Sequence, residues 1–178
     1  ALAGAVGASL LAMVAGLPKS RAATPESSDE DLIRLRGAGE RCTLLATELE
    51  ALVDRDSEAY ELVVSAYRLP KGTDDEKAAR ARGIQRALES AIAAPLEVMR
   101  ACAAALACGP VLQALGNVNA SSDVQVGLEL LRAGLRGARA NVEINLASVK
   151  DQAYAAAVAA EVARLSESGA AAAPSASS

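Results

Sequence analysis

Apolar residues recur every three to four positions through most of the chain, which is the spacing of one buried face of an α-helix. Residues 1–17 form an apolar run that stops at Pro18, and a polar stretch follows over residues 18–27. The hydroxyl of Ser28 can cap a second helix, which we expect to continue to Tyr67. We expect this helix to bend near Gly37 and Gly39. Its apolar stripe consists of Leu45, Leu49, Leu52, Val63 and Tyr67.

A Pro- and Gly-containing break at residues 69–72 separates this helix from a third one. Thr73 is followed three residues later by Glu76, and this pair makes a capping box that begins the third helix. We expect the third helix to kink at Pro95 and to end at the Gly-Pro sequence of residues 109–110. Its apolar face carries Ile84, Leu88, Ala91, Val98, Cys102 and Leu106.

The remaining chain predicts three further helices. A short helix over about residues 110–116 leads into the polar turn 116–121. Ser122 is expected to cap the next helix, which runs to about Val149, and a last helix spans about residues 151–168. The apolar seam of the longest of these helices is Val124, Leu128, Leu131, Leu135, Ala138, Val142, Leu146 and Val149.

The composition supports an all-α fold in which backbones approach closely. Hydrophobic residues make up 52% of the chain, but aromatic residues only 2%, so the core must consist of Ala, Leu, Val and Ile. We predict a single domain over residues 1–168, a bundle of about five to six long, Ala-rich helices, followed by a disordered tail over residues 169–178. The large Ala surface also favours an oligomer.

Several classes of function are disfavoured by composition. The net charge of −4 argues against a nucleic-acid partner. The absence of histidine excludes Ser-His and Cys-His nucleophilic systems and most zinc sites, so we expect no metal. Cys42, Cys102 and Cys108 are scattered and odd in number, which indicates reduced thiols in a cytoplasmic protein. Acid–base catalysis would have to use Asp, Glu, Lys or Tyr.

The apolar segment 1–17 resembles a signal peptide or a membrane span only superficially. It lacks a basic leading region, it is weakly hydrophobic because of its Ala and Gly content, and it is short for a bilayer. We therefore expect a buried helix and no membrane association. Because the chain starts abruptly inside an apolar run, a missing N-terminal segment is compatible with the sequence.

One carboxylate interrupts an apolar face. Asp56 lies four residues after Leu52 and four before Tyr60, on the stripe of its helix, whereas Asp54 and Glu58 are expected to point elsewhere. Such a carboxylate is either paired in the core or exposed to a cavity. If it is buried, its raised pKa would suit a general base. The alternative is an Asp with an Arg partner at a bend or interface.

Two further groups of polar residues have both a functional and a structural interpretation. Helical spacing places Asp123, Gly127, Gly134, Asn141 and Asn145 on one side of their helix, where amides beside glycines could recognise a polar heterocycle. Alternatively, these glycines allow close helix packing, and the amides are satisfied across an interface. The polar turn at residues 117–122 could bind an anion or a carbonyl, or could be ordinary turn and cap chemistry.

Several motifs, taken together and in order, carry a resemblance. The chain contains ALAGAVGASLLAMVAGL at 1–17, the long stretch LVDRDSEAYELVVSAYRLPKGTDDEKAARARGIQRALESAIAAPLEVMRAC at 52–102, GNVNASSDV at 116–124 and GARANVEINL at 137–146. In these segments it resembles the formiminotransferase-cyclodeaminase C-terminal family, which includes methenyltetrahydrofolate cyclohydrolases. The Gly-rich, Ser-containing lead that precedes Ala-Leu-Ala-Gly in that family is not in this sequence.

The resemblance implies an all-helical cytoplasmic homodimer with folate sites near the dimer interface and no cofactor beyond the tetrahydrofolate substrate. It also implies one of two reactions in one-carbon metabolism. Cyclohydrolases open 5,10-methenyltetrahydrofolate with water, and cyclodeaminases expel ammonia from 5-formiminotetrahydrofolate. A free-standing chain with GTDDEKAARARGIQ looks more like the cyclohydrolases. The alternatives are a cyclodeaminase and a non-catalytic helical interaction protein of the same fold.

The resemblance also implies a set of site residues. Asp56 or Asp123 would act as general base, and Lys71 or Lys19 would supply a proton or a positive field. Amide side chains would read the pterin edge or hold the water, and basic side chains would meet the glutamyl carboxylates. The substrate-binding residues implied in this way are Lys19, Arg21, Arg80, Gln85, Asn117, Ser122, Asn141 and Asn145.

Overall fold

The computed structural model describes residues 1–18 and 28–171, and within these ranges the fold is entirely helical, as predicted. The predicted tail therefore lies outside the described residues from position 172 onward, and the last helix continues three residues past its predicted end. In chain order the elements are α1 (Leu2–Gly16), α2 (Asp29–Tyr67), α3 (Asp74–Leu106), α4 (Gly109–Leu115), the 3₁₀ helix η1 (Val118–Ala120), α5 (Ser121–Leu146) and α6 (Gln152–Ala171).

Two predicted helix starts are confirmed. The Ser28 hydroxyl accepts a hydrogen bond from the backbone N–H of Asp31 at 3.2 Å, which caps α2. At the start of α3 the Glu76 N–H donates to Thr73 Oγ1 at 3.2 Å, and the Thr73 N–H donates to Glu76 Oε2 at 2.9 Å. This reciprocal capping box satisfies N–H groups that otherwise lack partners at a helix start.

Two predicted helix boundaries are wrong. Ser122 does not cap α5, because the helix already begins at Ser121 and the side chain of Asn117 instead accepts the Asn119 N–H at 2.9 Å. The Gly-Pro sequence at residues 109–110 begins α4 rather than ending α3, which stops at Leu106. Proline is tolerated in a first turn, where its missing N–H would have no helical partner.

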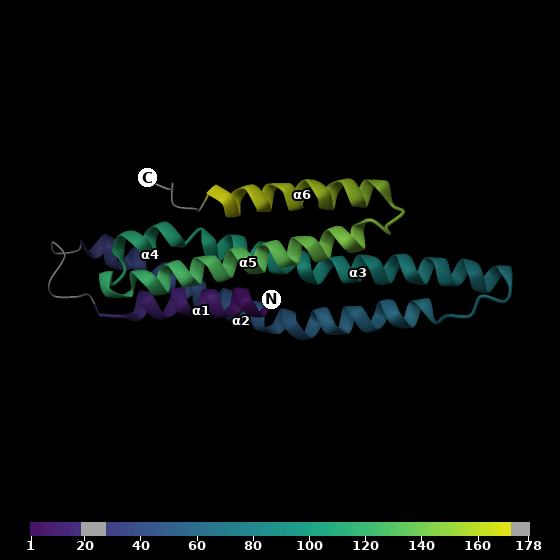
Figure 1. Ribbon diagram of the computed structural model, residues 1–178, viewed down its shortest axis with the longest axis horizontal. Coiled ribbons are helices and arrows are strands. Elements are labelled where there is room, and N and C mark those ends of the chain that lie inside the picture. The colour runs from purple at the N-terminus through teal and green to yellow at the C-terminus, as the bar shows by residue number, and fades with distance from the viewer. Residues whose placement is uncertain (19–27, 172–178) are drawn as a thin grey trace.

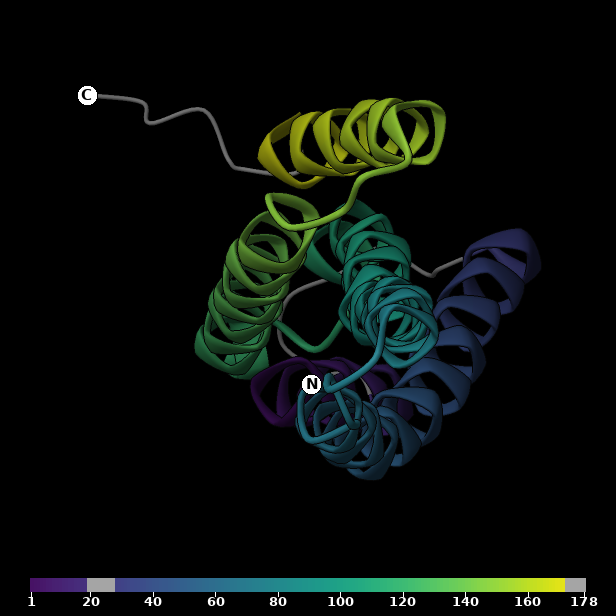
Figure 2. The same ribbon diagram turned by 90° about the vertical axis from the view of Figure 1, so that its right-hand side faces the viewer.

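Four helices form a ring around the core. α1 packs on α2 and α5, and α3 closes the ring by packing on the same two helices (Figure 2). α4 contacts α2 and α5, and α6 lies outside the ring on α3 and α5 (Figure 1). The stretch Asp74–Leu115 is long and apolar enough to cross a membrane, but 67% of its most apolar window is buried within the bundle. Packing inside the bundle accounts for that composition.

α1 and α5 are antiparallel and pack unusually closely through glycines. A Cβ atom added at Gly7 would lie 2.6 Å from the Gly127 carbonyl oxygen, and one added at Gly134 would lie 3.1 Å from the Gly4 nitrogen. Neither position therefore has room for a side chain without movement of backbone. The close-packing interpretation of Gly127 and Gly134 is confirmed.

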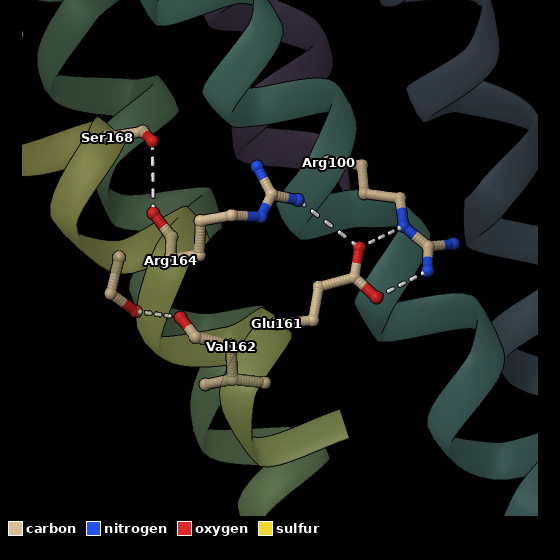
Figure 3. A network of polar contacts seen from close by, with 6 residues as sticks. Arg100, Glu161, Val162, Arg164 and Ser168 are labelled. Atoms are coloured by element: carbon tan, nitrogen blue, oxygen red, sulfur yellow. Dashed lines mark hydrogen bonds and ion pairs between the residues drawn. The ribbon is translucent and has the colours of Figure 1, made fainter. Parts of the chain in front are cut away.

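α6 is attached to the bundle by an ion-pair network as well as by apolar contacts (Figure 3). Arg100 of α3 donates from Nε and Nη2 to the two carboxylate oxygens of Glu161, both at 2.8 Å, and Arg164 lies 3.5 Å from the same carboxylate. The hydrogen bonds from Arg100 lower the pKa of Glu161 below its ordinary value. The three cysteines are free, as predicted.

α1 is much shorter than its neighbours, and this shapes the molecule. It has 15 residues, whereas α2 has 39 and α3 has 33. The N-terminus consequently lies near the middle of the long axis, and the α2–α3 hairpin extends well beyond it (Figure 1).

Candidate functional site

A groove continues the line of α1 between α2, α3 and α5. The face of α5 that packs on α1 through Gly127 and Gly134 continues past Ala1 and there presents Asn141 and Asn145. Asp56 lines this part of the groove from the α2 side. This opening comprises a cavity of about 680 Å³ and a smaller one of about 270 Å³ beside Ala1, and the two share Asp56, Ser57 and Asn141.

The larger cavity is acidic. Asp56, Glu58 and Glu61 line it, and no Lys or Arg does. Glu58 also borders this wide opening, although helical spacing turns it away from Asp56. Asp56 is exposed and forms no hydrogen bond or ion pair within the described part of the chain, so the Arg-partner alternative does not hold there. Uncompensated carboxylates on a concave surface favour a cationic ligand.

Two amides face these carboxylates from α5. Asn145 Nδ2 donates to Asn141 Oδ1 at 2.8 Å and to the Asn141 carbonyl oxygen at 3.0 Å. The pair is thus held in one orientation, while Oδ1 of the Asn145 side chain and Nδ2 of the Asn141 side chain have no partner among the described residues. One donor and one acceptor are available at the groove, which suits the edge of a polar heterocycle.

The same groove becomes basic further along the helices. Residues further along both sides of the groove follow by helical spacing. Tyr67 lies two turns after Tyr60 on α2, and Ser148 lies one turn after Asn145, just past the end of α5. A second cavity of about 460 Å³ lies there, between the α2–α3 turn and the α5–α6 connection. Its cationic lining residues are Lys71, Lys77, Arg80 and Lys150.

Two predicted site residues shape this basic cavity through hydrogen bonds from their side chains to backbone atoms. Gln85 accepts the Lys150 N–H through Oε1 at 2.7 Å and donates from Nε2 to the Ser148 carbonyl oxygen at 3.3 Å. Arg80 donates from Nη2 to the Tyr67 carbonyl oxygen at 3.1 Å, and its guanidinium carbon lies 5.6 Å from the centre of the Tyr67 ring. Both side chains fix the loops that carry Lys71 and Lys150.

The remaining predicted residues lie at the opposite end of α5. Asp123 is eighteen residues before Asn141, which is about 27 Å along a helix. Asn117 donates from Nδ2 to the Pro18 carbonyl oxygen at 2.7 Å, so it joins the end of α1 to the turn before α5, close to Ser122. Within one chain, Asp123 and Asp56 therefore do not share a site. Lys19 and Arg21 lie outside the described residues.

Sequence reasoning missed four groove residues. Glu61 and Glu58 share the cavity with Asp56, and Lys77 and Lys150 join the predicted cations. Lys77 is one turn before Arg80 and could have been found by helical spacing. Lys150 could not, because its position depends on how the α5–α6 connection folds back onto Gln85. No group of three or more potential metal ligands occurs among the residues described by the structure.

Comparison with known proteins identifies relatives over most of the chain. A family model described as formiminotransferase-cyclodeaminase matches residues 1–164. A methenyltetrahydrofolate cyclohydrolase from Methylorubrum extorquens is 37% identical over 155 residues, covering 87% of this chain and 73% of that protein. A formimidoyltransferase-cyclodeaminase from Sus scrofa is 40% identical over 64% of this chain, but this covers only 21% of that longer protein. The crystal structure of a formiminotetrahydrofolate cyclodeaminase from Thermotoga maritima superposes with a TM-score of 0.74 at 25% identity, over 96% of this chain and 79% of that one.

Proposed function

Because the chain belongs to the formiminotransferase-cyclodeaminase family, we propose that it hydrolyses 5,10-methenyltetrahydrofolate to 10-formyltetrahydrofolate. The relative from Methylorubrum extorquens, which is 37% identical over 87% of this chain, carries that activity in its name. The protein would therefore be an enzyme of one-carbon metabolism whose only small-molecule partner in the reaction, besides water, is the folate.

The charge pattern of the groove is the observation that carries this proposal. The methenyl bridge is an amidinium cation, and the far end of a folate carries glutamyl carboxylates. The acidic cavity at Asp56 and the basic cavity at Lys71 follow each other along the same three helices. Ala91 in the first cavity and Ile84 in the second are seven residues apart on α3, about 10 Å. A ligand with a cationic centre and an anionic tail fits this order.

The reaction needs a base, a stabilised tetrahedral carbon and a proton for the leaving nitrogen. We assign Asp56 as the base: its carboxylate takes a proton from water while the water oxygen bonds to the methenyl carbon. The hydroxyl group of this tetrahedral adduct then loses its proton to solvent as its oxygen forms the formyl C=O bond, and the bond from the carbon to N5 breaks. N5 takes the proton that Asp56 removed from the water, the formyl group remains on N10, and one proton is released overall. The cation is already electrophilic, so charge stabilisation by Asp56 and Glu61 and positioning by Asn141 and Asn145 complete the chemistry.

A homodimer would complete the site. The outward face of α1 has no charged residue and exposes Leu2 by 67%, Val6 by 47% and Met13 by 46%. A stripe of this kind favours association with a second copy. Because Gly7 lies beside Gly127, a two-fold axis at that level would bring the Asp123 end of α5 in one copy towards the Asp56 groove of the other. This arrangement explains how Asp56 and Asp123 could serve one site, in a cytoplasmic dimer.

A cyclodeaminase is the second candidate. The solved structural relative and the formimidoyltransferase-cyclodeaminase relatives favour it, and a formimino cation would meet the same carboxylates. The two activities differ in product, since only ring closure of formiminotetrahydrofolate releases ammonia.

The decisive experiment follows loss of the near-ultraviolet absorbance of methenyltetrahydrofolate with purified protein. Asp56→Asn should lower kcat by about 10²- to 10⁴-fold, since it removes the base. Asp54→Asn is the matched control, because Asp54 is an exposed neighbour on α2 that does not line the groove. Ammonia release is measured in parallel with formiminotetrahydrofolate. Ammonia release without hydrolysis would identify a cyclodeaminase, and neither turnover nor folate binding would leave a non-catalytic interaction protein.

A further inference from the structure

Aromatic residues are rare in this chain, and they are concentrated at the groove. The sequence has three tyrosines and no Phe or Trp. Two of them, Tyr60 and Tyr67, line the acidic and the basic cavity respectively, on one face of α2 and about 10 Å apart along it. The buried core of the described residues contains no aromatic ring, whereas two rings line these cavities. This contrast indicates that flat surfaces have a function there.

The three rings differ in what covers them. Tyr154 is half-buried against the core, and the guanidinium of Arg80 lies over the Tyr67 ring at 5.6 Å. Tyr60 is 66% exposed and has neither a hydrogen bond nor a ring contact within the described residues. Among the described residues, its ring is therefore the aromatic surface of the groove that has no ring or cation contact.

The neighbours of Tyr60 define what could occupy its ring. Asp56 lies one helical turn before it on α2, and Asn141 and Asn145 line the same cavity from α5. A planar group in this cavity could present its face to Tyr60, its edge to the two amides and its positive charge to Asp56. Offset stacking of this kind adds to simple area burial and requires a flat partner.

We propose that Tyr60 is the stacking wall of the acidic cavity and sets its selectivity for a flat ring system that carries an amidinium cation. This inference rests on the proposed function and adds a residue to it. Tyr60 binds the ring and does not transfer a proton, so it should affect substrate binding far more than turnover. Its phenol oxygen is dispensable, whereas its ring is not.

The test uses the full chain and separates ring from hydroxyl. Tyr60→Leu should raise the KM for methenyltetrahydrofolate about five- to tenfold with kcat changed less than threefold, the size expected for loss of one aromatic stacking pair. Tyr60→Phe should keep KM within twofold of wild type. Leu62→Ala is the matched control, because Leu62 is 54% exposed on α2 and does not line the cavity.

A binding readout makes the result independent of catalysis. The chain has no tryptophan, so Tyr60→Trp places a single indole in the cavity and Leu62→Trp places one outside it. Tetrahydrofolate should quench the fluorescence of the first variant and leave the second unchanged. Equal KM values for Tyr60→Leu and wild type, or equal quenching of both indoles, would overturn the role of Tyr60. Failure of the wild type itself to hydrolyse methenyltetrahydrofolate would instead overturn the proposed function, and the two quenching curves would still decide whether Tyr60 contacts the ring.

Discussion

Beside α1 the interior of the bundle is lined by apolar side chains, whereas further along α2, α3 and α5 charged and amide side chains line the cavities. The face of α5 shows the change within one helix: Gly127 and Gly134 pack against α1, and Asn141 and Asn145 continue that face uncovered. No polar or charged residue is classed as buried among the described residues. The polar groups of this helix face lie at the cavity, because there they can remain solvated.

We call the part of the bundle beside α1 the closed part and the part around the acidic cavity the open part. The closed part should contribute most of the folding free energy, and the prediction with the largest expected effect on stability tests this. Leu131 is fully buried there, so Leu131→Ala should lower the free energy of unfolding by about 2–5 kcal/mol through lost burial and a cavity. Val63→Ala, in the open part, should cost less than about 1 kcal/mol because Val63 is only partly buried. Urea denaturation measures both, and equal losses would show that the two parts are equally important for stability.

Replacing a glycine by alanine should change the stability less, and with opposite signs at Gly7 and Gly37. Gly7→Ala should destabilise by about 1–3 kcal/mol, because its Cβ would lie 2.6 Å from a backbone oxygen of α5. Gly37→Ala should stabilise by about 0.5–1 kcal/mol, since nothing lies within 4 Å and alanine favours the helix. Thermal unfolding of both variants would reveal the sign. A stable Gly7→Ala protein would mean that α1 can move away from α5.

The smallest effect concerns α6, outside both parts. Glu161→Gln should lower stability at pH 7 by less than about 1 kcal/mol, because the pair with Arg100 is partly exposed. The pKa of Glu161 is lower in the folded protein than its ordinary value, so the ion pair stabilises the fold above that ordinary value. The difference between wild type and variant should disappear as the pH falls through the folded pKa. A difference that persists in acid would point to packing instead of charge.

Local signals in the sequence predicted the helices well, and they failed where two signals compete. The cap at Ser28, the capping box at Thr73 and the apolar seams correctly predicted that α2, α3 and α5 exist. Ser122 lost its predicted capping role because Asn117 starts a 3₁₀ turn just before it and α5 begins one residue early. The Gly-Pro sequence at residues 109–110 suits either the end or the start of a helix, so its side of the junction could not be read from the sequence.

Candidate site residues were found by periodicity and resemblance, but their grouping was not. Helical spacing correctly aligned Asp123 with Asn141, yet it does not register that 27 Å separates them along α5. It also could not show that Gln85 uses its amide to hold the Ser148–Lys150 backbone. The register of α1 against α5 depends on which glycines meet between two helices that are distant in the sequence, and spacing within one helix does not reveal this.

The overhanging α2–α3 hairpin has a consequence for how different parts of the chain open. Near its tip, around Tyr67 and Thr73, few neighbours surround the two helices, so their backbone amides should exchange with deuterated solvent faster than those beside α1. We therefore expect the hairpin side of the basic cavity to open more readily than the part of the fold beside α1. A carboxylate-bearing ligand bridging Lys71 and Lys150 would slow exchange there first, before any protection appears in the closed part.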